Sequence, residues 1–385
     1  MEIRMILFLL TFLCLYGGIN FYFFFRVRSV LHLSGAPQAL LLVLLIFLIL
    51  APVVVRTLES LHCEQAARFV ACTGYVWMAF VFLFFFLSVS LELVRFLHKL
   101  IVPEIGTMAL KAVTFGLSVL LSAGLVVYGC IDAQRVRVRT LQIPVQQVLP
   151  KEGKLRIVQI SDVHVGIIIR NDRLSPMLEK VREAKPDMLV STGDLLDGEL
   201  DNIMADAERF AAIETPAGKF AVLGNHEYYA GVSRSIEFTE AAGFQILRDD
   251  VTQAAGLTIF GEDDITGRKP GATPKSAAFL KALAEKQNGF VLLLKHQPHI
   301  REKANFNLQL SGHTQRRPAF PLRLYRKTLF PQNLRFAYSG GKQAAVHQPR
   351  HRHLGAARAH FRPAGNHRHR SDRQKTIRGN GMPAK

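Results

Sequence analysis

The stretch LRIVQISDVHVG (155–166) decides the fold of the second half of this chain. Its first six residues are mostly aliphatic and β-branched, which is typical of a strand buried within a sheet. The run ends in Ser-Asp-Val-His, so Asp162 and His164 follow directly where the strand ends. Open α/β sheets place their ligand crevice at the carboxyl ends of strands. We therefore expect these two side chains to belong to a functional site.

The same alternation of strand and helix patterns continues to residue 314. We predict helices over 173–186, 205–213, 236–242 and 277–285. The predicted strands cover 135–145, 155–162, 187–194, 219–227, 257–263, 289–298 and 307–314. Such alternation predicts a layered α/β domain in which helices cover the strands.

Side chains that can bind metals follow most of the predicted strands. Carboxylate, amide oxygen and imidazole together suit divalent cations. Taken alone, a Gly-Asp after a strand is usually a turn, and Asn225 could cap a helix. Their combination in this order favours a metal site over those alternatives. The candidates are Asp162, His164, Asp194, Asn225, His226, His296 and His313.

Five short blocks carry a resemblance to a known family. They are SDVH (161–164), TGD (192–194), GNHE (224–227), KHQP (295–298) and SGHT (311–314). In this order they resemble the signature blocks of the calcineurin-like metallophosphoesterases, and the first resembles the ISDxHxG block of a membrane-associated branch. The resemblance covers residues 155–314 and implies a four-layer α/β/β/α sandwich of two mixed sheets.

The resemblance also implies roles for the candidate residues. Asp162 and His164 would bind a first divalent ion, and Asp194 would bridge it to a second, the two being Mn, Fe or Zn. The second ion would take Asn225, His296 and His313, and His226 would be the catalytic histidine. The implied reaction is hydrolysis of a phosphate mono- or diester, in which a bridging hydroxide attacks phosphorus. We interpret the nearby polar residues as structural: Glu227, Asp263, Asp264 and His299.

Residues 1–131 form a separate hydrophobic region. Each of four stretches is long enough to cross about 30 Å of hydrocarbon as a helix. They cover residues 5–25, 37–55, 69–94 and 108–131, and none has a charged residue at its centre. A signal peptide would supply one short stretch, so we predict a four-span anchor of a multi-pass protein of the bacterial cytoplasmic membrane. Basic residues are too evenly distributed to assign the side of the catalytic domain. The anchor makes a lipid-linked substrate one option.

Residues 315–385 differ from the predicted domain at 132–314. They contain 17 of the 48 Lys and Arg residues and one acid, Asp372, and thus carry +16 of the formal net charge of +18. This composition predicts a disordered basic tail. The family's last block reads GHTHGGQ, whereas this chain reads GHTQRRP, so Gln315 stands where a further histidine ligand is expected. Reading the gene in a frame shifted by one base from that codon would restore the family block. The shifted frame also permits amino-acid sequences similar to those of the family at 345–355 and 362–371. We therefore predict a reading-frame shift and impaired activity.

Two other functions remain open at this point. A catalytically inactive membrane protein could use its basic tail to bind metal or nucleic acid. A scaffold or transporter could be built from the four spans, although their centres lack the ionisable residues of a substrate pathway. The tail lacks interleaved aromatic residues, and no nucleic-acid partner is expected. The sequence favours a membrane-anchored metallophosphoesterase acting on a phosphate ester.

Overall fold

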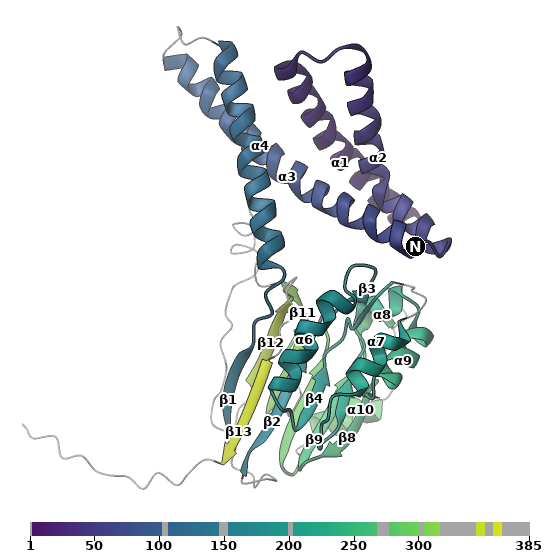
Figure 1. Cartoon of the computed structure of the whole chain (residues 1–385). Coiled ribbons are helices and arrows are strands. Elements are labelled where there is room, and N and C mark those ends of the chain that lie inside the picture. Colours follow the sequence, from purple (N-terminus) through teal and green to yellow (C-terminus); the bar gives the residue numbers. More distant parts are fainter. Residues whose placement is uncertain are drawn as a thin grey trace, which may run out of the picture.

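The chain has four N-terminal helices followed by an α/β domain (Figure 1). The structure, a computed structural model, describes residues 2–101, 107–145, 153–198, 203–267, 277–285, 287–300, 304–315, 344–350 and 357–363. The N-terminal helices are α1 (Glu2–Leu31), α2 (Gly35–Ser60), α3 (Glu64–Ile101) and α4 (Thr107–Asp132). Each contains a segment long and apolar enough to cross a membrane, which agrees with the four predicted spans.

Polar contacts join these helices within an otherwise apolar bundle. The Trp77 indole N–H on α3 donates a 2.8 Å hydrogen bond to the side-chain oxygen of Asn20 on α1. The Tyr22 hydroxyl lies 2.9 Å from the Ser88 hydroxyl. Interhelical hydrogen bonds of this kind contribute modestly to the association of membrane helices.

Two mixed sheets form the centre of the α/β domain. The first has the order β1-β13-β2-β4-β6-β7, and the second has the order β12-β11-β10-β9-β8. Neighbouring strands are parallel except for the antiparallel pairs β13–β2 and β8–β9. The first sheet contains β1 (Arg139–Val145), β13 (Ala357–Pro363), β2 (Leu155–Ile160), β4 (Met188–Ser191), β6 (Lys219–Ala221) and β7 (Gln245–Ile246). The second contains β12 (Ala344–Arg350), β11 (Leu308–Gln315), β10 (Phe290–Lys295), β9 (Leu257–Glu262) and β8 (Asp250–Ala254).

Side chains alternate between two cores along the central strands. Ile157 of β2 packs between the sheets with Leu292 of β10. Its neighbour Val158 points to the opposite face and packs in the core that contains Leu178 and Phe210. Those two residues lie on the helices that cover the first sheet, α6 (Asn171–Glu183), α7 (Met204–Ala211) and α9 (Val232–Ala241).

The outer face of the second sheet is covered by α10 (Ala277–Ala284), whose Phe279 packs against Phe260 of β9. The layer order is therefore helix, sheet, sheet, helix. This confirms the α/β/β/α sandwich with mixed sheets that the resemblance implied.

Some local predictions differ from the structure. The predicted strand 219–227 ends at Ala221, and the short helix α8 (Asn225–Tyr229) follows. Strand β8 was not predicted because its sequence, DVTQA, is polar and lies at a sheet edge. In the region predicted to be a disordered tail, 344–350 and 357–363 form β12 and β13, where backbone pairing with β11, β1 and β2 replaces a periodic side-chain pattern. Apart from these segments and Gln315, the tail lies outside the described residues.

The anchor contacts the α/β domain through residues 165–172, which we call the strap. Ile167 and Ile168 of the strap pack against an apolar cluster at the facing ends of α2 and α3 that contains Val55 and Val70. Two ion pairs flank this contact: Arg170 lies 3.1 Å from Glu64, and Arg68 of α3 lies 2.8 Å from Asp172. The beginning of α3 therefore lies directly over β3 (Val165–Gly166) and α8 (Figure 1).

Candidate metal centre

The predicted ligand residues all lie at one edge of the two sheets. Asp162 follows β2, Asp194 follows β4, and Asn225 begins α8 after β6. His296 follows β10, and His313 lies near the end of β11. Because β2, β4 and β6 are parallel, and β10 and β11 are parallel, the carboxyl ends within each sheet meet at the same edge.

Asp194 lies at the centre of the cluster. It is fully buried, and its Oδ1 accepts a 2.9 Å hydrogen bond from the backbone N–H of His226. Its Oδ2 lies 3.2 Å from Nε2 of His296 and 3.7 Å from Nε2 of His164. Among the described residues Oδ2 has no hydrogen-bond partner. Burial alone would raise the pKa of Asp194, but the adjacent His296 holds that pKa well below its usual range.

Two groups of potential ligands share Asp194. One group is His164, Asp194 and His226, and the other is Asp194, His296 and His313. Within each group the ligand atoms lie within 4.8 Å of one another. A carboxylate shared by two such groups is the arrangement expected of a bridging ligand in a two-metal site.

The remaining predicted ligands border these groups. The side-chain oxygen of Asn225 lies 3.2 Å from Nε2 of His296. Asp162 is buried, and its Oδ2 accepts hydrogen bonds from the hydroxyl of Ser161 at 2.6 Å and from the backbone N–H of His313 at 3.1 Å. The structure thus brings all seven candidate residues together.

The surroundings of His296 indicate whether this cluster suits a cation. Its Nδ1 lies 2.8 Å from the carbonyl oxygen of Thr192, which leaves Nε2 as the ligand-type nitrogen. That Nε2 faces acceptor atoms of Asn225 and Asp194, and it lies 3.0 Å from Nδ1 of His313. Burial alone would lower the pKa of His296, but Asp194 raises it to about 9. A positive charge between these acceptors, whether a proton or a divalent cation, offsets the negative charge of Asp194 and interacts favourably with the Asn225 oxygen. The residues therefore fit a metal ion.

The backbone at the site adopts a conformation that few non-glycine residues take. Four candidate ligands have positive φ, and each such residue costs on the order of 1–3 kcal/mol. They are Asp162 (φ 54°), His164 (53°), Asp194 (54°) and His313 (68°). The fold therefore holds strained backbone where its ligand-type side chains converge, which is common at functional sites.

Gly193 shows how tightly the loops pack. It has φ 93°, and a Cβ at this position would lie 2.7 Å from both the backbone nitrogen of Gly224 and Nδ1 of His296. A larger residue would therefore push apart the loops that carry Asp194 and Asn225. The glycine in the TGD block is required by this close approach.

Glu227 connects two of the ligand-bearing loops. Its carboxylate accepts backbone hydrogen bonds from Asp194 at 3.0 Å, Leu195 at 2.5 Å, Leu196 at 3.1 Å and Gly224 at 2.7 Å. Burial and the charge of Asp194 raise the pKa of Glu227, while the donors from Leu196 and Gly224 oppose that shift. These contacts support a structural interpretation of Glu227, because its carboxylate joins the loop after β4 to the loop after β6. The spacing of Gly224 and Glu227 is that of a capping box.

Asp197 is a site residue that the sequence analysis missed. Its Oδ1 lies 2.9 Å from Nδ1 of His226, and its Oδ2 lies 3.8 Å from Nδ1 of His164. Asp197 ends the short strand β5 (Leu196–Asp197), which pairs with β3. The signal available in the sequence was the second aspartate of GDLLDG (193–198), three residues after Asp194.

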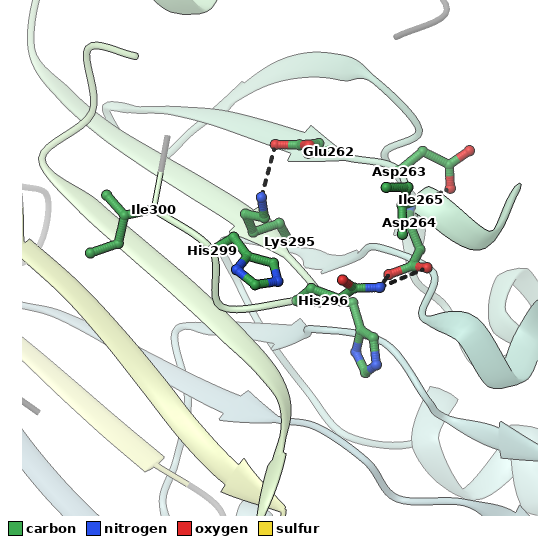
Figure 2. A pocket seen from close by; sticks show the side chains of 9 residues that line it. Glu262, Asp263, Asp264, Ile265, Lys295, His296, His299 and Ile300 are labelled. Carbon is green, nitrogen blue, oxygen red and sulfur yellow. Dashed lines mark hydrogen bonds and ion pairs between the residues drawn. The ribbon is translucent and has the colours of Figure 1, made fainter. Parts of the chain in front are cut away.

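A cavity of about 250 Å³ opens beside His296 (Figure 2). Within it, Lys295 forms a 3.3 Å ion pair with Glu262, and Gln297 donates to Asp264 at 3.1 Å. The lining residues are Glu262, Asp263, Asp264, Ile265, Lys295, His296, Gln297, His299 and Ile300.

The other polar residues interpreted as structural are held by neighbours or line that cavity. Asp263 accepts hydrogen bonds from the Tyr228 hydroxyl at 2.6 Å and from Nε of Arg248 at 3.1 Å. His299 is exposed at the cavity. Gln315 ends β11, and its side chain lies outside the described part of the chain.

Comparison with known proteins identifies the family. The model of the calcineurin-like phosphoesterases matches residues 155–317. An uncharacterised metallophosphoesterase of Aquifex aeolicus is 38% identical over 192 residues, which are 49% of this chain and 72% of that protein. The chain belongs to the calcineurin-like metallophosphoesterase family. It is therefore a metal-dependent phosphoesterase by family, as the signature blocks predicted.

Metallophosphoesterases with membrane segments are among the similar proteins. A transmembrane protein with metallophosphoesterase domain from Danio rerio is 30% identical over 221 residues, which are 54% of this chain and 51% of that protein. A Bos taurus protein of the same description is 28% identical over 233 residues, 56% of this chain and 52% of that protein. The chain thus spans about half the length of these two relatives. Its four apolar helices, each long enough to cross a membrane, and its similarity to these transmembrane proteins indicate a membrane protein.

Proposed function

We propose that this metallophosphoesterase hydrolyses a phosphate mono- or diester with two divalent cations held around Asp194. The observation that carries the proposal is the position of Asp194, whose buried carboxylate belongs to two groups of ligand atoms. Mn, Fe and Zn ions all accept the oxygen and nitrogen ligands present.

The first cation is assigned to Asp162, His164 and Asp194, and the second to Asp194, Asn225, His296 and His313. When bound, divalent cations polarise phosphoryl oxygens and make a nucleophile available from water at neutral pH. The protein holds these ligands in fixed positions through the hydrogen bonds of Glu227 and Ser161. That support matters because ligand positions set both affinity and catalysis.

His226 is assigned to the leaving group, and Asp197 positions it. Asp197 accepts from Nδ1 of His226 at 2.9 Å, which directs Nε2 away from Asp197. Because Asp197 holds Nδ1, Nε2 is the ring nitrogen that can donate a proton to the departing oxygen. The His226 side chain is 24% exposed, so a substrate can reach it.

The location and state of the chain complete the proposal. We assign it to the bacterial cytoplasmic membrane, with residues 1–131 as anchor and residues 132–314 as catalytic domain, to whose sheets β12 and β13 are added. Gln315 replaces the histidine that completes the first metal's ligands in the family block, so this chain is proposed to bind that metal weakly. A frame shift at the Gln315 codon accounts for both the replacement and the basic composition of 315–385.

Metal removal tests the proposed function directly. The full chain in lipid nanodiscs is treated with excess chelator and then titrated with Mn²⁺. Bound metal is measured together with hydrolysis of p-nitrophenyl phosphate and bis-p-nitrophenyl phosphate. We expect chelation to abolish hydrolysis and Mn²⁺ to restore it, because every proposed step requires the cations. Full hydrolysis with no bound metal would overturn the assignment.

A further inference from the structure

Exposed apolar side chains gather around the candidate metal centre. Within the described part of the α/β domain, the large apolar residues that are exposed are Met204, Tyr229, Val251, Ile265 and Ile300. The ring of Tyr229 lies 5.7 Å from that of His226. Ile265 and Ile300 line the cavity beside His296, where Figure 2 shows them on opposite sides. We call Tyr229, Ile265 and Ile300 the apolar rim.

The rim belongs to one continuous part of the structure. Tyr229 ends α8, and Ile265 begins the short helix η1 (Ile265–Gly267). The two elements are in contact, because a Cβ added at Gly267 would overlap the ring of Tyr228. Apolar side chains exposed beside a buried polar cluster indicate a ligand with an apolar part as well as a charged one.

The strap places this centre next to the membrane surface. Charged side chains of Arg56, Glu59, Glu64 and Arg68 occupy the facing ends of α2 and α3. Such charges mark the level at which spanning helices leave the hydrocarbon, since burying them in lipid is costly. Ile167 and Ile168 of the strap pack against α2 and α3 at this level. His164 lies three residues away, a distance of at most about 11 Å along an extended chain.

We propose that the phosphoester substrate is carried by a membrane lipid, with its phosphate at the Asp194 cluster and its apolar chains on the apolar rim. The inference rests on the proposed function, because it assigns the phosphate to the same cluster. A lipid in the anchoring bilayer reaches the site without crossing water, since the rim, His226 and the strap adjoin one another. A soluble phosphoester would leave the rim exposed to water.

Binding of two unreactive analogues separates the possibilities without requiring turnover. The probes are glycerol phosphonate and its dihexanoyl ester, titrated by calorimetry with Mn²⁺ into the full chain in nanodiscs. Protein-free nanodiscs measure partitioning of the ester into lipid. We expect the ester to bind at least about tenfold more tightly, because burying a few methylene groups suffices for that ratio.

Rim substitutions locate the apolar part of the ligand. The triple variant Tyr229→Ser, Ile265→Ser, Ile300→Ser should lose the preference for the ester and keep its affinity for glycerol phosphonate. Val251→Ser is the matched control, because Val251 is equally an exposed apolar residue but lies on β8 and does not line the cavity. It should leave both affinities unchanged.

Each other outcome has a defined meaning. Equal affinities for the two probes would overturn the lipid substrate and leave the proposed function intact. A preference that persists in the triple variant would overturn the role of the rim. Absence of Mn²⁺-dependent binding of both probes would overturn the proposed function and this inference with it.

Discussion

The two ligand groups around Asp194 are supported by different parts of the molecule. The group with His296 and His313 comes from the ends of neighbouring parallel strands, β10 and β11, and His296 is anchored by Thr192. The group with His164 and His226 comes from the turn before the strap and from the short helix α8. Its side chains are 13% and 24% exposed, whereas that of His296 is fully buried.

This difference separates a half of the centre that is supported by the sandwich core from a half that lies next to the anchor. The half at β10 and β11 depends on the core of the sandwich, where side chains are close-packed. The half at His164 directly precedes the strap, whose Ile167, Ile168 and Arg170 contact the anchor. In the proposed assignment Gln315 also stands in place of a ligand of the first metal, so the missing ligand and the contact with the anchor both concern the His164 half. Substitutions can therefore test the halves separately.

The largest effect is expected from Asp194→Ala, compared with His226→Ala. Removing the shared carboxylate should abolish binding of both metals and all turnover. His226→Ala should keep the metals and reduce turnover by roughly 10²–10⁴-fold, the usual contribution of a general acid. Metal content by mass spectrometry and hydrolysis rates measure both variants. If His226→Ala releases metal as completely as Asp194→Ala, then His226 is a ligand and its assigned role is wrong.

An intermediate effect is expected at residue 315. Gln315→His should raise Mn²⁺ affinity at the weaker of the two sites by on the order of tenfold or more, because even partners of metal ligands contribute 10–100-fold. Affinity at the tighter site should not change. The measurement is a metal titration of the full chain with Gln315→Asn as the matched control. Equal affinities in all three proteins would remove residue 315 from the first metal's ligands.

Sequencing the gene tests the predicted frame shift. Deleting one base at the Gln315 codon should restore GHTHGGQ, together with an ordered C-terminal region and higher activity. Codons at 345–355 and 362–371 that are incompatible with the family-like strings would contradict the shift.

The sequence predicted much of this site because its ligands follow strong strand patterns. Asp162, Asp194 and His296 each follow a run of aliphatic residues, so their position at one edge of the sheets could be inferred from the sequence alone. Asp197 was missed because it lies in a two-residue strand that shows no periodicity. The apolar rim was also missed, since isolated isoleucines and tyrosines are normal on surfaces and only their positions around His226 and His296 give them meaning.

Contact between the strap and the anchor could not be predicted for a similar reason. It joins residues about one hundred positions apart, such as Arg68 and Asp172, through surface charges that carry no pattern. Tertiary packing decides which of the many charged residues on the surface form ion pairs. Only the structure shows that the loop after His164 is held by membrane helices.

The smallest effect is expected from weakening that contact with Arg170→Gln and Asp172→Asn. These substitutions remove the ion pairs to Glu64 and Arg68, and exposed pairs contribute about 0.2–1 kcal/mol each. The first metal should therefore bind at most about fivefold more weakly per pair, while the second, held by β10 and β11, should be unaffected. Metal titrations of each variant give the two affinities. Lys180→Gln is the matched control, because it removes the Lys180–Glu183 pair of α6, which does not involve the anchor. If both metals weaken equally, the strap supports the whole domain rather than the His164 half, and the distinction between the two halves fails.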